Sequence, residues 1–131
     1  MVGVVLVAHA PLATALAACA RHVLGDVALA CVDVEADASP EALFEDILGC
    51  IAAEDHGDGV LVLADLVGAT PFNVALRAAQ AAVEAGRRCE ILAGANVPML
   101  LRVLNYRTRP LSDLAECGAA GATHGVAVFK P

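Results

Sequence analysis

The sequence is poor in aromatic residues and in basic residues. It contains three Phe, one Tyr and no Trp, and only eight of its 131 residues are Lys or Arg, against fifteen Asp and Glu. The net charge of −7 and the dispersed basic residues argue against nucleic-acid binding, which relies on clustered Lys and Arg. With so few aromatic side chains, the core must consist of small aliphatic residues in close layers, which favours helices lying on a sheet.

Several sequence patterns are also missing. No apolar run reaches the roughly 18 residues that span a bilayer, and the N-terminus lacks a signal-peptide pattern, so we expect a cytoplasmic protein. The five cysteines are odd in number and show no CxxC or other ligand spacing, which predicts buried apolar positions and no metal site. Neither a GxGxxG nor a P-loop motif is present, and without a GxSxG motif we expect no serine-hydrolase chemistry.

What the sequence does contain is a regular alternation of strand-like and helix-like segments. Short β-branched runs typical of buried parallel strands alternate with segments of helical period. The alternation predicts one domain, residues 1–131, with a three-layer α/β/α fold and a mainly parallel, flavodoxin-like sheet. Strands are expected at 2–7, 28–34, 60–63, 89–92 and 126–129, and helices at 12–24, 40–53, 71–85, 98–104 and 112–120.

Three loops lead from a predicted strand end to a predicted helix start. They are AHAP (8–11), ADLVGATPFN (64–73) and AGANVP (93–98), each with a proline near the helix start. Ligands of open parallel sheets bind beyond the carboxyl ends of the strands. Helix N-termini offer free N–H groups to an anion such as phosphate. The three loops therefore predict a phosphate site at this edge.

Polar residues in these loops form a candidate catalytic group. His9 ends the first predicted strand and Asp65 ends the third, so if these strands are neighbours the carboxylate can accept the Nδ1–H of the imidazole. Nε2 would then be free as a nucleophile. Thr70 offers a hydroxyl and backbone N–H groups to phosphate oxygens. We expect Asn73 and Asn96 to brace their loops.

Three segments carry a resemblance to a known family. VLVAHAPLATAL, VLADLVGATPFNVA and ILAGANVPMLLRVL, in this order and spacing, resemble the signature segments of the EIIA component of the mannose-family phosphoenolpyruvate-dependent sugar phosphotransferase system (PTS). The resemblance covers nearly the whole chain. It implies that His9 is the phosphorylated residue, that Asp65 hydrogen-bonds it, and that Gly68, Ala69 and Thr70 bind the phosphate, with Pro11 as loop support.

The resemblance also implies an activity and partners. The protein would be a transferase-class phosphocarrier that takes a phosphoryl group from phospho-HPr onto His9 and passes it to a separate EIIB protein, for sugar uptake or regulation. This transfer would need no metal and no cofactor. It would meet the membrane only indirectly, through a transporter complex. The family is usually a homodimer in which a C-terminal strand, here Val126–Phe129, adds antiparallel to the partner's sheet.

The chain departs from the family pattern in two places, and two other functions remain open. Ala10 and the Gly68-Ala69-Thr70 turn stand where glycine and Gly-Gly-Ser are common, which requires a negative φ at each alanine. One alternative is the phosphocarrier subunit of a dihydroxyacetone kinase system. The other is a non-catalytic, flavodoxin-like binding or regulatory module in which His9 only contacts a phosphorylated ligand.

Overall fold

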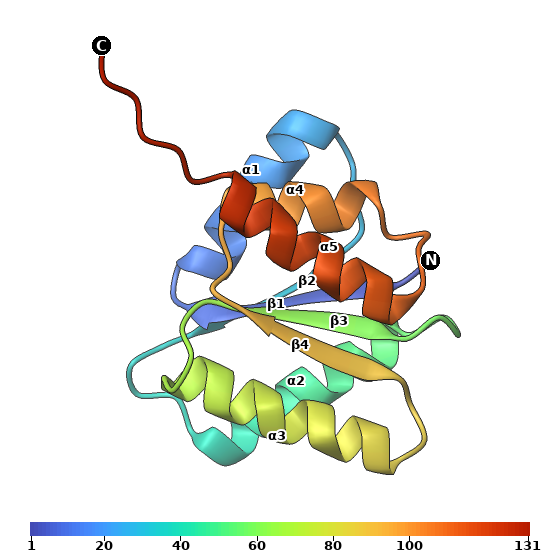
Figure 1. The fold of residues 1–131 in the computed structure, drawn as a ribbon. Helices are drawn as coiled ribbons and strands as arrows, with labels where there is room; N and C mark the ends of the chain where they lie inside the picture. The colour runs from blue at the N-terminus through green and yellow to red at the C-terminus, as the bar shows by residue number, and fades with distance from the viewer.

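Four parallel strands form a sheet in the order β2-β1-β3-β4. The computed structural model, which describes residues 1–131, places β1 at Gly3–His9, β2 at Ala30–Val34, β3 at Val60–Ala64 and β4 at Cys89–Ala93 (Figure 1). The chain steps from β1 outward to β2, and then crosses back over β1 to β3. The strand order therefore reverses between β1 and β3, which is where ligands bind in such sheets.

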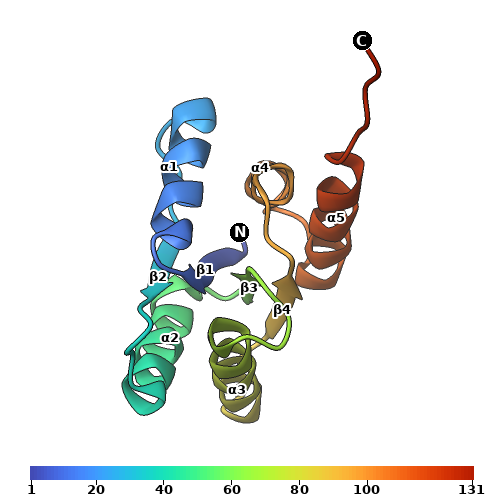
Figure 2. The same ribbon diagram turned by 90° about the vertical axis from the view of Figure 1, so that its left-hand side faces the viewer.

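Helices cover both faces of this sheet (Figure 2). On one face lie α1 (Leu12–Leu24), α4 (Val97–Asn105) and α5 (Leu111–His124), and on the other lie α2 (Pro40–Glu54) and α3 (Thr70–Glu84). Three-layer α/β/α architecture is thus confirmed. None of the helices is long and apolar enough to cross a membrane.

The two central strands carry the core. All residues of β3 and all of β1 except His9 are buried, and successive side chains point to opposite faces. Leu6 belongs to the apolar cluster under α1 and α4, whereas Val5 and Val7 belong to the cluster over α2 and α3. Burial on both faces explains why these strands are continuously apolar in sequence.

The last helix runs further than the sequence predicted. We expected it to stop near Ala120, but α5 continues to His124 because its glycines are packing residues rather than helix stops. A Cβ on Gly118 would lie 2.7 Å from Val103, and one on Gly121 would lie 2.8 Å from Arg102. The glycines let α5 lie close against α4.

The predicted strand at Val126–Phe129 does not form in the single chain. These residues have no regular structure and extend away from the body of the protein (Figure 1). Val126, Val128 and Phe129 are 73%, 86% and 85% exposed. A strand requires hydrogen bonds from a neighbour, and no strand lies beside this tail.

The cysteines were predicted to be buried, and that prediction is wrong for Cys19. All five are free thiols; Cys19 is exposed on α1 and the other four are half-buried. Cys19 is exposed because of its position on the helix: Ala17 and Ala20 lie on the buried face of α1, and Cys19 does not.

A buried arginine fixes the start of β1, at the end of the sheet that lies opposite to His9. The Arg107 side chain donates from Nε to the Val2 carbonyl at 3.0 Å and from a guanidinium nitrogen to the Ala28 carbonyl at 2.6 Å. Burial lowers the pKa of Arg107, while Glu54 opposes that shift. Arg107 thereby ties the first strand to the segment that leads into β2.

Candidate functional site

His9 and Asp65 meet where the strand order reverses. His9 is the last residue of β1, Asp65 follows the last residue of β3, and the two strands are hydrogen-bonded neighbours. The sequence predicted a contact between His9 and Asp65 if their strands were neighbours, and this condition is met. The backbone of the next residue is also held, because the Ala10 N–H donates to the Val34 carbonyl at 3.0 Å.

One oxygen of Asp65 accepts both hydrogen bonds from His9. Nδ1 of the ring lies 2.7 Å from Oδ2, and the backbone N–H of His9 donates to the same oxygen at 3.0 Å. An ionised carboxylate only accepts, so the hydrogen between the side chains belongs to Nδ1, and in the neutral ring Nε2 keeps its lone pair. The pair fixes both the orientation and the tautomer of the imidazole.

The electrostatics of Asp65 favour its charged form. Burial raises the pKa of the Asp65 carboxyl, but the hydrogen bonds from the His9 backbone and ring, together with the attraction between the two groups, outweigh burial and leave the pKa below its ordinary value of 3.8. The Asp65 side chain is only 10% exposed, whereas that of His9 is 55% exposed. The imidazole is thus held by a buried carboxylate on one side and exposed to solvent on the other.

His9 opens onto a cleft of about 570 Å³. The cleft lies between the β1–α1 loop, the β2–α2 loop and the start of α3. Its lining residues are His9, Ala10, Val34, Glu35, Ala36, Ala38, Pro40, Thr70 and Pro71. A more apolar but smaller cleft lies between α3 and β4 and does not include His9. The chemistry of a site follows its polar groups.

The loop between β3 and α3 presents a helix N-terminus to this cleft. Gly68 adopts a positive φ of 86°, which favours glycine, and the side chain of Asn73 donates to the Gly68 carbonyl at 3.1 Å. Ala69 has a φ of −81°, and Ala10 also has a negative φ, so alanine is accommodated at both positions. No side chain caps α3, which leaves its first N–H groups beside Thr70 available to an anion.

The third loop does not take part in the cleft. Asn96 caps α4, accepting from the Met99 N–H at 2.9 Å, and donates to the Ala122 carbonyl at 3.4 Å. It braces α4 against α5 and does not line the cleft with His9. Pro11 precedes α1 as its N-cap residue and is exposed outside the cleft lining.

The β2–α2 loop takes the place of that third loop, and the sequence analysis missed it. The position of β2 beside β1 brings the segment from Val34 to Pro40 to the cleft. Its helix start has the same proline signature as the other loops, with Ser39 as N-cap and Pro40 in the first turn. The signal was therefore present in the sequence, although only three other loops were predicted to form the site.

A second missed contact anchors the helix that follows His9. The Asp33 carboxylate accepts from the Thr14 backbone N–H at 3.1 Å and from the Thr14 hydroxyl. Asp33 lies on β2 in register with Ala8. The carboxylate therefore fixes the first turn of α1 against the strand beside His9.

No group of three or more His, Cys, Asp or Glu residues is arranged to hold a metal ion.

Comparison with known proteins places the chain among sugar phosphotransferase components. A family model described as "PTS system fructose IIA component" matches residues 3–117. None of the curated proteins compared with the sequence gives a match.

Solved structures of similar fold have related descriptions. Phosphotransferase system component EIIA from Streptococcus agalactiae superposes with a TM-score of 0.85 at 24% identity, over 98% of each chain. The mannose/sorbose specific IIA subunit from Enterococcus faecalis gives a TM-score of 0.85 at 22% identity, over 99% of this chain and 96% of that one. A PTS IIA protein associated with the fucose utilization operon of Streptococcus pneumoniae gives 0.76 at 17% identity, over 96% and 91%.

The Asp65–His9 contact predicts a pH-dependent loss of stability in Asp65→Asn. Because the native pKa of Asp65 is lowered, the unfolded chain takes up this proton at a higher pH than the native protein does. The stabilisation is therefore present above about pH 4 and is lost as pH falls through the native pKa. Near pH 7 we expect the variant to unfold about 1 kcal/mol more easily, as for loss of a charged hydrogen-bond acceptor.

Urea unfolding of both proteins between about pH 3 and pH 7 measures this difference. The difference in the free energy of unfolding between the wild type and Asp65→Asn should become smaller towards the acid end of this range. Asp26→Asn removes the same charge at an exposed position and should show little change at any pH. A gap for Asp65→Asn that stays constant across the range would contradict the account.

Proposed function

This chain belongs to the EIIA-man family of PTS fructose IIA components, and from that membership we propose that it is a cytoplasmic phosphocarrier whose His9 accepts a phosphoryl group from phospho-HPr. It then passes the group to an EIIB protein, for sugar uptake or its regulation. The single observation that supports this most strongly is the His9 ring, bound at Nδ1 by Asp65 and open at Nε2 onto the cleft. The protein is thus a transferase component with a phosphohistidine intermediate.

The proposed transfer follows from that geometry. Nε2 of His9 attacks the phosphorus, the P–N bond of the donor phosphohistidine breaks, and the donor ring leaves with the bonding electron pair. The His9 ring becomes a phosphorylated imidazolium, whose charge the Asp65 carboxylate compensates. The Thr70 hydroxyl and the free N–H groups of α3 are available to donate hydrogen bonds to the phosphoryl oxygens. These bonds would position the phosphoryl group for transfer.

Two exposed apolar residues beside the site support a protein donor. Leu66 and Val67 follow Asp65 directly and are 60% and 67% exposed. The turn that carries them is held by the Ala69 N–H, which donates to the Leu66 carbonyl, and by the Asn73 contact. Large apolar side chains held on the surface next to a reactive group indicate contact with another protein.

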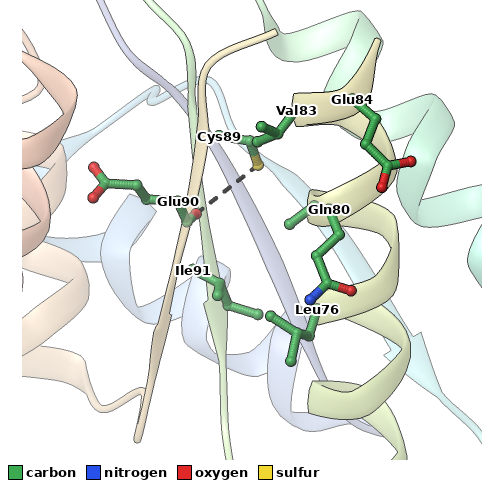
Figure 3. Close-up of a pocket in the computed structure, with 8 residues that line it drawn as sticks. Leu76, Gln80, Val83, Glu84, Cys89, Glu90 and Ile91 are labelled. Carbon is green, nitrogen blue, oxygen red and sulfur yellow. Dashed lines mark hydrogen bonds between the residues drawn. The ribbon is translucent and has the colours of Figure 1, made fainter. Parts of the chain in front are cut away.

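We also propose a homodimer formed by exchange of the C-terminal tail. β4 is an edge strand, so one side of its backbone is free to pair. Beside it runs a groove of about 390 Å³ against α3, in which Leu76 and Ile91 point toward each other (Figure 3). Val126 and Val128 are exposed and two residues apart, so in an added strand they would share the face that covers such a groove, with Phe129 on the opposite face.

Labelling tests the phosphocarrier proposal. Incubation with phosphoenolpyruvate, Enzyme I and HPr should add about 80 Da of acid-labile mass, as one phosphoryl group does. His9→Ala should abolish the label because no other residue offers a ring nitrogen in the cleft. His22→Ala, at an exposed position on α1, should be labelled like the wild type. Label that persists in His9→Ala, seen by intact-protein mass spectrometry, would contradict the assignment.

The same experiment separates the alternatives. A non-catalytic binding module would acquire no covalent mass. A phosphocarrier of a dihydroxyacetone kinase system would be labelled at His9, but would pass the group to a kinase subunit rather than to an EIIB protein.

Sedimentation tests the dimer. We expect the wild type to sediment as a dimer at micromolar concentration. The double variant Val126→Asp, Val128→Asp should be a folded monomer, because both carboxylates would lie on the face of the added strand that covers the groove and would have to be buried there. Val23→Asp places a charge on an exposed apolar residue of α1 and should leave the dimer intact. A monomeric wild type would rule out exchange of the tail.

A further inference from the structure

The cleft beside His9 contains an acidic residue that the proposed transfer does not use. We propose that Glu35 determines donor specificity: it disfavours small phosphate anions and favours a protein donor that brings a basic side chain next to its own phosphohistidine. This inference rests on the proposed function of His9. It concerns which donor reaches the histidine, not the transfer itself.

The charge of the cleft is unusual for a phosphoryl site. Apart from His9, Glu35 is the only ionisable residue that lines it, and no Lys or Arg does. Arg77, on α3, lies seven residues beyond Thr70, about 10 Å along the helix axis, and its guanidinium lies over the Phe44 ring. The protein thus offers a phosphoryl group hydrogen-bond donors but no basic side chain of its own.

The backbone of Glu35 is held by its loop. The residue directly follows β2, and its carbonyl accepts from the Ala38 N–H in a turn at 3.1 Å. Asp37 lies within the same turn and is also exposed, so both charges face the solvent through which a donor approaches. The net charge of the whole chain, −7, is also negative.

The expected size of the effect follows from elementary electrostatics. A unit charge about 7 Å from a singly charged anion in water changes its binding by about two- to threefold, less at high salt. A negative Glu35 therefore lowers the local concentration of free phosphate compounds. The same carboxylate attracts a donor with a Lys or Arg near its phosphohistidine, and that cation then stabilises the charge on the transferring group.

Phosphoramidate is a suitable small probe because it phosphorylates histidine without any other protein. Nε2 of His9 attacks its phosphorus, the P–N bond breaks, and ammonia leaves with the bonding pair and the protons already on that nitrogen. The product is the same phosphorylated ring beside Asp65. Comparison with phospho-HPr then reports on one acceptor with a small donor and with a protein donor.

The test is the rate of His9 labelling in Glu35→Gln by each donor at low salt. We expect the rate with phosphoramidate to rise about two- to threefold and the rate with phospho-HPr to fall by a similar factor. Both changes should fade in about 0.5 M salt. Glu116→Gln is the matched control: it removes the same charge at an exposed position of α5, a helix that does not line the cleft, and should change neither rate.

Opposite changes in the two rates support the role of Glu35, and so does phosphoramidate labelling of the variant alone. Rates that move together, rates that match those of Glu116→Gln, or labelling of neither protein by phosphoramidate would overturn it. A failure of the proposed function looks different: phospho-HPr would then leave wild-type His9 unlabelled, whatever phosphoramidate does.

Discussion

The candidate site depends on one carboxylate oxygen, Oδ2 of Asp65, which accepts from both the backbone and the ring of His9. A bond to the ring alone would leave the histidine free to swing with its loop, and a bond to the backbone alone would leave the ring free to rotate. Together they fix the histidine along the strand and about its side-chain torsions. Nε2 is therefore positioned in advance, which is the main requirement of the proposed phosphoryl transfer.

That oxygen reaches His9 only because β1 and β3 are neighbours in this register. Val7 pairs with Ala64, the last residue of β3, so Asp65 leaves the sheet beside the last two residues of β1, which continues to His9. Burial on both faces secures the register, since a shift by one residue would exchange the side chains of the two core clusters. Alanines on α1 and α3 let these helices lie close to the strands, so a core almost without aromatic residues still fills its volume.

Local patterns in the sequence predicted the strands, the helices and the meeting of His9 with Asp65, because strand ends and helix starts are encoded by nearby residues. Features set by tertiary neighbours were not predictable in this way. Asn96 reads as a loop residue until α5 is present to accept its amide hydrogen. Glu35 reads as a solvated charge until the strand order places its loop against His9. Val126–Phe129 has strand-like composition but lacks a neighbouring strand in the single chain.

Nitrogen-15 NMR of the His9 ring, recorded at about pH 8 where an ordinary imidazole is neutral, tests the central claim most directly. The contact with Asp65 predicts that Nδ1 carries the hydrogen and Nε2 does not. After phosphorylation, phosphorus should couple to Nε2 while the proton stays on Nδ1. A neutral ring with its hydrogen on Nε2, or a phosphoryl group on Nδ1, would contradict the role assigned to Asp65.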